Sequence, residues 1–119
     1  MTEWTVPATV ERVIDGDTIA VTLDLGWEIY KHDHVRVAHI DAPELKTPEG
    51  KLARAYAETL LPVGRKIIVV SHSLDKYGRA LATIKYQTFY ADHVDTIDYG
   101  SEMISKGHAL AWEGSGPKP

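Results

Sequence analysis

The first forty residues alternate between apolar and polar positions in short runs, which predicts β-strands. Residues 5–13 are rich in Val and Thr. Pro7 places the start of this strand at a sheet edge, because proline has no N–H to donate to a ladder. In residues 18–23 the apolar side chains fall on one face. Residues 27–30 and 35–40 predict two further strands with a polar, looping or bulged stretch between them, so an antiparallel meander is expected.

A helix is predicted next, over residues 48–61, because an apolar stripe continues from Leu52 at every fourth position. Thr47 is the expected N-cap, and Pro48 suits the first helical position. Proline and glycine follow the helix and end it. Residues 66–72 then form a continuous apolar run, which predicts a strand that is buried on both faces.

The rest of the chain predicts one more strand, at residues 80–86, and a short helix at residues 99–106 that Gly107 closes. Five short strands with a helix between the third and fourth fit a five-stranded OB-type barrel of the α+β class, with a short C-terminal helix. The periodicity alone also allows another small α+β or barrel fold. We expect one domain over residues 1–112 and a flexible tail at residues 113–119.

Composition narrows the class of protein. The 119 residues suit one domain, and the absence of cysteine excludes disulfides and zinc–thiolate sites. The apolar runs are too short to cross a membrane, and no signal-peptide pattern is present. We therefore expect a cytoplasmic protein with no membrane partner, unless a leader is missing from the sequence. The sequence does not predict an oligomeric state.

The net charge of −4 is concentrated in one segment. Residues 87–105 hold four acids and no Lys or Arg, whereas the remainder has 13 acids and 13 bases. The simplest interpretation is a solvated loop and helix face, and contact with a partner is the alternative. An acidic total argues against a protein that coats nucleic acid non-specifically.

Three clusters carry candidate chemistry: Asp-Gly-Asp-Thr at residues 15–18, a strand end at residues 36–44, and a turn at residues 75–79. Each cluster alone is compatible with an ordinary turn. Together they supply carboxylates, which are the oxygen ligands that Ca²⁺ or Mg²⁺ prefers. They also supply arginines, whose planar forks match phosphate oxygens, and a further acid that can take a proton from water. This set suits cleavage of a phosphodiester bond.

In this order the clusters resemble the staphylococcal nuclease-like (thermonuclease) family, from Val10 to Trp112. The resemblance implies a five-stranded OB barrel with the active site on one rim. It implies that Asp17 and Asp41 bind one Ca²⁺ directly, together with the backbone carbonyl of Ala42. Asp15 is implied to be a further acid close to that ion.

The remaining roles are also implied by the resemblance. Glu44 matches the residue that orients or deprotonates the attacking water, and Arg36 matches the clamp on the scissile phosphate. Arg79 matches the second clamp, which favours the transition state. Lys76 and Tyr77 match positions that hold a terminal phosphate of the substrate.

The implied function is Ca²⁺-dependent hydrolysis of DNA and/or RNA with little sequence specificity, leaving 3′-phosphates. One alternative is a non-catalytic OB-fold module that binds single strands, and another is a structural or inhibitory protein of nuclease ancestry. The complete set of catalytic positions favours the enzyme. His32 and His34 share a strand face, but no third metal ligand stands at a recognisable spacing, so they are expected at the surface. Trp112 is expected in the core, with base stacking as its alternative.

Overall fold

The computed structural model describes residues 4–74 and 80–112. Its elements, in chain order, are β1 (Trp4–Asp15), β2 (Thr18–Asp24), β3 (Tyr30–Val37), β4 (Ile40–Asp41), α1 (Pro48–Leu60), β5 (Lys66–Leu74), β6 (Ala80–Phe89), β7 (Val94–Asp98), α2 (Tyr99–Ser105) and β8 (Leu110–Ala111). The turn expected at residues 75–79 and the tail expected at residues 113–119 lie outside the described residues. No helix in the described ranges is long and apolar enough to cross a membrane.

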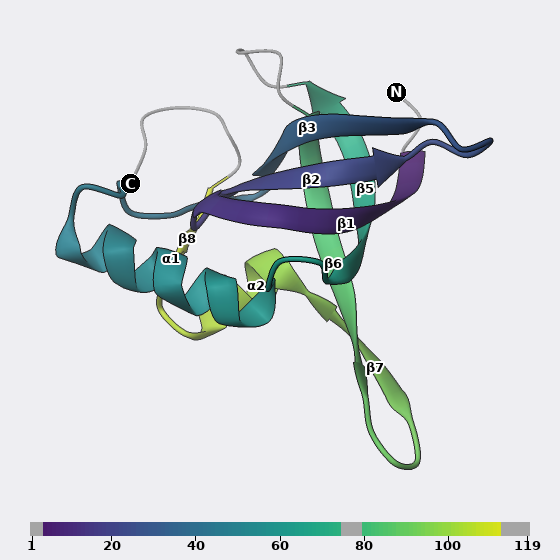
Figure 1. Ribbon diagram of the computed structural model, residues 1–119. Coiled ribbons are helices and arrows are strands. Elements are labelled where there is room, and N and C mark those ends of the chain that lie inside the picture. The colour runs from purple at the N-terminus through teal and green to yellow at the C-terminus, as the bar shows by residue number, and fades with distance from the viewer. Residues whose placement is uncertain (1–3, 75–79, 113–119) are drawn as a thin grey trace.

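The main sheet closes on itself. Its strands lie in the order β3-β2-β1-β5-β6-β7, and β3 also pairs with β6 in parallel, which completes a ring of five strands. Strand β7 stands outside the ring and forms a hairpin with β6 that projects away from it (Figure 1). A ring of strands with α1 inserted between β3 and β5 confirms the predicted OB-like α+β fold.

The core fills the ring because alternate side chains of each strand point inward. Each strand of the ring contributes a side chain that is at most 1% exposed: Val10, Ile19, Val35, Val69 and Ile84. Helix α1 faces this core with small residues, including Ala53 and Ala57, which let it approach closely. The candidate site lies at the rim near α1.

Three local features that the sequence predicts are present in the structure. The Oγ1 atom of Thr47 accepts a hydrogen bond from the N–H of Gly50 at 3.0 Å, so the predicted N-cap of α1 is confirmed. Pro7 is confirmed at a local edge: it pairs with Ile68 of β5, whereas pairing with β2 begins at Ala8. Gly107 follows α2 with a φ of 78°, as its predicted role in closing that helix requires.

The predicted strand at residues 27–30 is wrong. Trp27 and Glu28 have positive φ angles of 53° and 62°, and Trp27 is 96% exposed, so this apolar stretch is a loop. Strand β3 instead runs unbroken from Tyr30 through the polar stretch that was expected to loop or bulge, because the ladder to β2 stays complete there. It ends at Val37, before His39 turns the chain with a φ of 70°.

The prediction that residues 66–72 are buried on both faces is also wrong. Ile67 and Val69 point into the ring, whereas Ile68 points outward and is 37% exposed. Strand β6 continues three residues beyond its predicted end at Tyr86. The stretch predicted as a surface excursion therefore includes an ordered hairpin.

Candidate active site

The turn between β1 and β2 is fastened to the end of β3 and to β4 by Asp17. Its backbone carbonyl accepts a hydrogen bond from the N–H of Val37 at 2.9 Å. Its Oδ2 atom accepts one from the N–H of Ala42 at 3.0 Å. Asp17 is only 8% exposed. These bonds bring the first two predicted clusters to one rim of the ring.

Arg36 lies between two acids at this rim and is buried, with 7% of its surface exposed. Its Nη2 atom is 3.4 Å from Oδ2 of Asp17 and 3.9 Å from Oδ1 of Asp41. The same guanidinium donates hydrogen bonds to the carbonyls of Val37 and Ile40, at 2.6 and 2.8 Å. The structure thus gathers three of the predicted site residues into one buried cluster.

The environment of Asp17 disfavours its charge. Burial is the main cause and, with the side chain of Asp15, it raises the pKa of Asp17 to about 6. The N–H of Ala42 and the charge of Arg36 oppose that rise. Asp15 also accepts a hydrogen bond from the backbone N–H of Asp17 at 3.1 Å, which shapes the turn. A cation beside these acids would favour their ionised form.

Tyr99 also fixes the turn between β1 and β2. Its hydroxyl donates a hydrogen bond to the carbonyl of Gly16 at 2.6 Å, and the side chain is fully buried. Burial, with the charges of Asp17 and Asp15, raises the pKa of this hydroxyl, so it stays a donor. A Cβ atom on Gly16 would lie 2.8 Å from that of Ala42, so glycine is needed there. No local pattern in the sequence predicts this role of Tyr99, because the two hydrogen-bond partners are 83 positions apart.

Trp112 covers the guanidinium of Arg36. The ring centroid is 5.7 Å from Cζ of Arg36, a distance typical of cation–π contact. Strand β8 places the ring there, because it pairs with β4 through Ile40 and Asp41, and the N–H of Trp112 bonds to the carbonyl of His39. Trp112 was expected in the core, but it is half-buried and contacts the site.

Glu44 lies on the loop between β4 and α1, three positions after Asp41. Its side chain is 72% exposed, and its Oε2 atom is 3.3 Å from Nζ of Lys46. Its carbonyl accepts hydrogen bonds from the N–H and the Oγ1 of Thr47, which hold the loop against α1. Three further predicted residues, Lys76, Tyr77 and Arg79, lie outside the described residues.

The donor chemistry fits a hard cation. Asp17 and Asp41 offer only oxygen, which Ca²⁺ prefers, and burial leaves the charge of Asp17 in need of compensation. Over residues 4–74 and 80–112, however, no group of three acidic or imidazole side chains is arranged to hold a metal. His32 bonds to Glu11 at 2.6 Å and lies at the surface, as predicted.

Comparisons with known proteins place these residues in a family context. Residues 34–118 match the family described as staphylococcal nuclease homologue. The chain is 37% identical over 104 residues to protein ParB of Escherichia coli, which covers 87% of this chain and 55% of that protein. It is 33% identical over 86 residues to the probable endonuclease LCL3 of Nakaseomyces delphensis, which covers 67% of this chain and 31% of that protein. The chain thus spans about half and about a third of the length of these relatives.

Proposed function

Because this chain belongs to the staphylococcal nuclease family, we propose that it is a metal-dependent nuclease that hydrolyses DNA, RNA or both. The family supports a nuclease or nucleic-acid-binding role, and one relative is named a probable endonuclease. The observation that carries the proposal is the buried cluster of Asp17, Arg36 and Asp41 at one rim. Two acids around an arginine form a site suited to a cation and a phosphate together.

Asp17 and Asp41 would hold one Ca²⁺, with the carbonyl of Ala42 as a further oxygen ligand and Asp15 close by. When bound, the ion supplies positive charge to the phosphate oxygens and lowers the pKa of a coordinated water. The fixed turn matters here, because the hydrogen bonds to Val37 and Ala42 set the position of Asp17 before any ligand arrives. Because Asp17 is already in position, no free energy is spent on reorganising it when the reaction occurs.

Arg36 binds the scissile phosphate in this proposal. Its guanidinium is positioned by two carbonyls and by Trp112, so little side-chain entropy is lost when an anion binds. Glu44 is exposed and accepts the proton of the attacking water. The water oxygen then bonds to phosphorus, and the P–O bond on the 5′ side breaks to leave a 3′-phosphate. Arg79 would stabilise the charge on the departing oxygen, which takes up a proton from solvent water to give a 5′-hydroxyl.

Substrate contacts beyond the reacting phosphate are assigned by resemblance. Lys76 and Tyr77 would hold a terminal phosphate of the bound strand. The binding is expected to have little sequence specificity, because contacts to phosphate carry no base information. Weak, transient binding at a metal-charged site also agrees with the acidic total of the chain.

Cleavage of single-stranded DNA, duplex DNA and RNA, measured with Ca²⁺ and with chelator, tests the proposal. We expect cleavage that needs Ca²⁺ and falls by about 10²-fold or more in Glu44→Gln, because the proposed proton acceptor is lost. Glu58→Gln, an exposed acid on α1, is the matched control and should retain full activity. Wild-type rates in both Glu44→Gln and Arg36→Ala would overturn the site. Strand binding without cleavage, unaffected by Ca²⁺, would instead support the binding module.

A further inference from the structure

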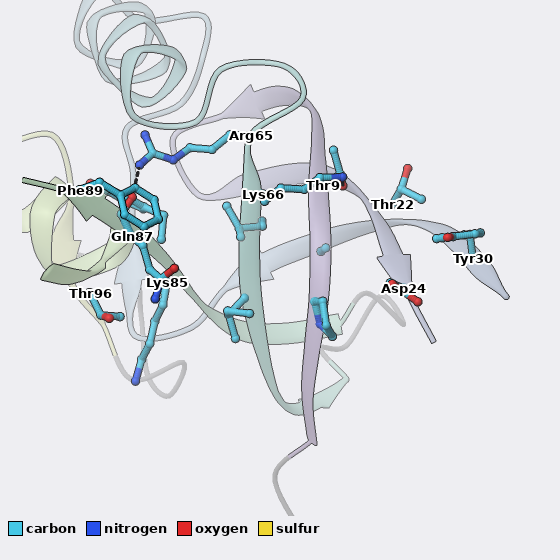
Figure 2. A pocket seen from close by; sticks show the side chains of 15 residues that line it. Thr9, Thr22, Asp24, Tyr30, Arg65, Lys66, Lys85, Gln87, Phe89 and Thr96 are labelled. Atoms are coloured by element: carbon cyan, nitrogen blue, oxygen red, sulfur yellow. Dashed lines mark hydrogen bonds between the residues drawn. The ribbon is translucent and has the colours of Figure 1, made fainter. Parts of the chain in front are cut away.

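A groove of about 1030 Å³ lies away from the candidate active site, between the β6–β7 hairpin and the outer faces of β1 and β5 (Figure 2). Thr9 of β1 lines it, whereas Asp15 at the end of the same strand belongs to the site. Six residues of extended strand separate the two, which is roughly 20 Å. The groove is therefore distinct from the rim that holds the two acids.

The groove is basic in a chain whose net charge is negative. Arg65, Lys66 and Lys85 line it, together with one acid, Asp24. The guanidinium of Arg65 donates to two backbone carbonyls and lies 4.5 Å from the ring centroid of Tyr86, so the partners it has here are neutral. The ammonium of Lys66 likewise donates to a threonine hydroxyl. These contacts leave positive charge in the groove for an incoming acidic group.

The hairpin beside the groove has two unlike faces. Phe89 and Val94 are cross-strand partners on the groove face and are 72% and 49% exposed. On the opposite face, Tyr90 stacks on His93 with ring centroids 4.6 Å apart, and Asp95 lies next to them. No Lys or Arg occurs from residue 87 to 105. The tip of the groove face is thus apolar, whereas the opposite face carries Asp95 beside His93.

We propose that a second copy of this chain occupies the groove, so that two chains exchange hairpins in a two-fold dimer. The Phe89–Val94 faces of the two hairpins meet at the axis. The acidic face of each hairpin, with Asp95, then lies against Lys66 of the partner subunit. One surface carries both the basic groove and the acidic, apolar hairpin, and such self-complementarity is what a two-fold interface requires.

A second copy fits these features better than a nucleic-acid strand does. Phosphates in the groove would lie beside Lys85, but the hairpin beyond it, over residues 87–97, contains Asp92 and Asp95 and no Lys or Arg. An exposed aromatic paired with an exposed valine is typical of interface cores. A two-stranded hairpin is also only marginally stable by itself in water, and a partner on both faces would stabilise it.

Sedimentation equilibrium of the full chain tests the dimer, and the expected mass is that of two chains. Phe89→Ser should give single chains, and Asp95→Lys should raise the dissociation constant about tenfold or more, because each dimer loses two charge pairs and gains repulsion. Asp95→Lys combined with Lys66→Glu should restore the wild-type constant. Leu52→Ser, at a 63% exposed position on α1, is the control and should remain dimeric. Melting curves identify any variant that fails to fold.

Three outcomes overturn the proposal. The first is a wild-type mass of one chain at every concentration tested, and the second is a charge-swapped variant no tighter than Asp95→Lys. Titration with labelled oligothymidylate is the second arm: if the strand binds single chains and Lys66→Glu abolishes that binding, the groove is a nucleic-acid site and the dimer is refuted. Because the main readout is mass, loss of the proposed nuclease activity would leave this test unaffected.

Discussion

Tyr99→Phe removes one oxygen atom and with it the hydrogen bond that holds the turn between β1 and β2. The carbonyl of Gly16 is buried under α2 and would lose its donor at 2.6 Å. Leaving such a group unsatisfied costs about 1–3 kcal/mol. Because the ring still fills its space, no cavity forms, so the loss of the hydrogen bond is the whole perturbation.

Two effects follow from that cost. The melting temperature should fall by about 4 °C or more, since roughly 1 kcal/mol corresponds to that shift in a domain of this size. The turn also carries Asp15 and Asp17, so part of the cost should appear as weaker Ca²⁺ binding. If about 1 kcal/mol reaches the site, the dissociation constant rises about fivefold. Cleavage at saturating Ca²⁺ should stay near the wild-type rate, because Tyr99 holds the turn and contacts no reacting group.

Calorimetric titration with Ca²⁺, paired with thermal melting, measures both effects. Tyr56→Phe is the matched control: its hydroxyl donates to Glu102 at 3.2 Å between the helices, so it should alter stability alone. If Tyr99→Phe melts lower but binds Ca²⁺ as tightly as the wild type, the claim that Tyr99 positions the metal ligands is refuted. An unchanged melting temperature would refute the energetic value assigned to the hydrogen bond.

Three further predictions concern the same rim. Gly50→Ala would place a Cβ atom 1.9 Å from the carbonyl oxygen of Glu44, so the loop that carries Glu44 must move. We expect kcat to fall about tenfold or more, while circular dichroism shows that α1 remains folded. In the metal-free protein the pKa of Asp17 is raised from 3.8 to about 6, so its contribution to stability is greatest below pH 4 and is lost as the pH rises through 6. In chemical denaturation, the free energy of unfolding of the wild type should fall by about 3 kcal/mol over that pH range, and that of Asp17→Asn should not. An equal dependence of the unfolding free energy on pH in both proteins would contradict this prediction. Trp112→Leu removes the ring over Arg36, so KM for oligonucleotides should rise about threefold to tenfold, and an unchanged KM would exclude that role.

The sequence predicted the elements whose signals are local. The alternation in residues 18–23 indicated β2, and Thr47 before Pro48 indicated the start of α1, because strand faces and helix caps depend on neighbouring residues. The strand predicted at Trp27 is wrong, since this apolar side chain is fully exposed in a left-handed loop that the hydrophobic pattern does not encode. The burial predicted for Ile68 is wrong because a run of apolar residues does not indicate which face of the strand stays uncovered.

In the candidate site, too, the residues that the sequence predicts differ from those that only tertiary packing brings in. Its acids and Arg36 were found through their order along the chain and a family resemblance, and the structure brings Asp17, Arg36 and Asp41 together. Tyr99 was missed, and the contact of Trp112 with Arg36 was not predicted, because each residue reaches the site only through tertiary packing. The groove depends on the pairing of β1 with β5, which joins residues as far apart as Pro7 and Ile68 and which no short pattern in the sequence specifies.

The pairing of β4 with β8 has a consequence for biosynthesis. Asp41 pairs with Leu110, 69 positions later, so the strand that carries this acid has no partner until translation has passed that point. At about 5–20 residues per second, this interval lasts several seconds. A nascent chain would therefore hold most of the proposed catalytic residues before Trp112 arrives over Arg36. The order of synthesis delays the pairing of β4 with β8 until all five strands of the ring have been synthesised.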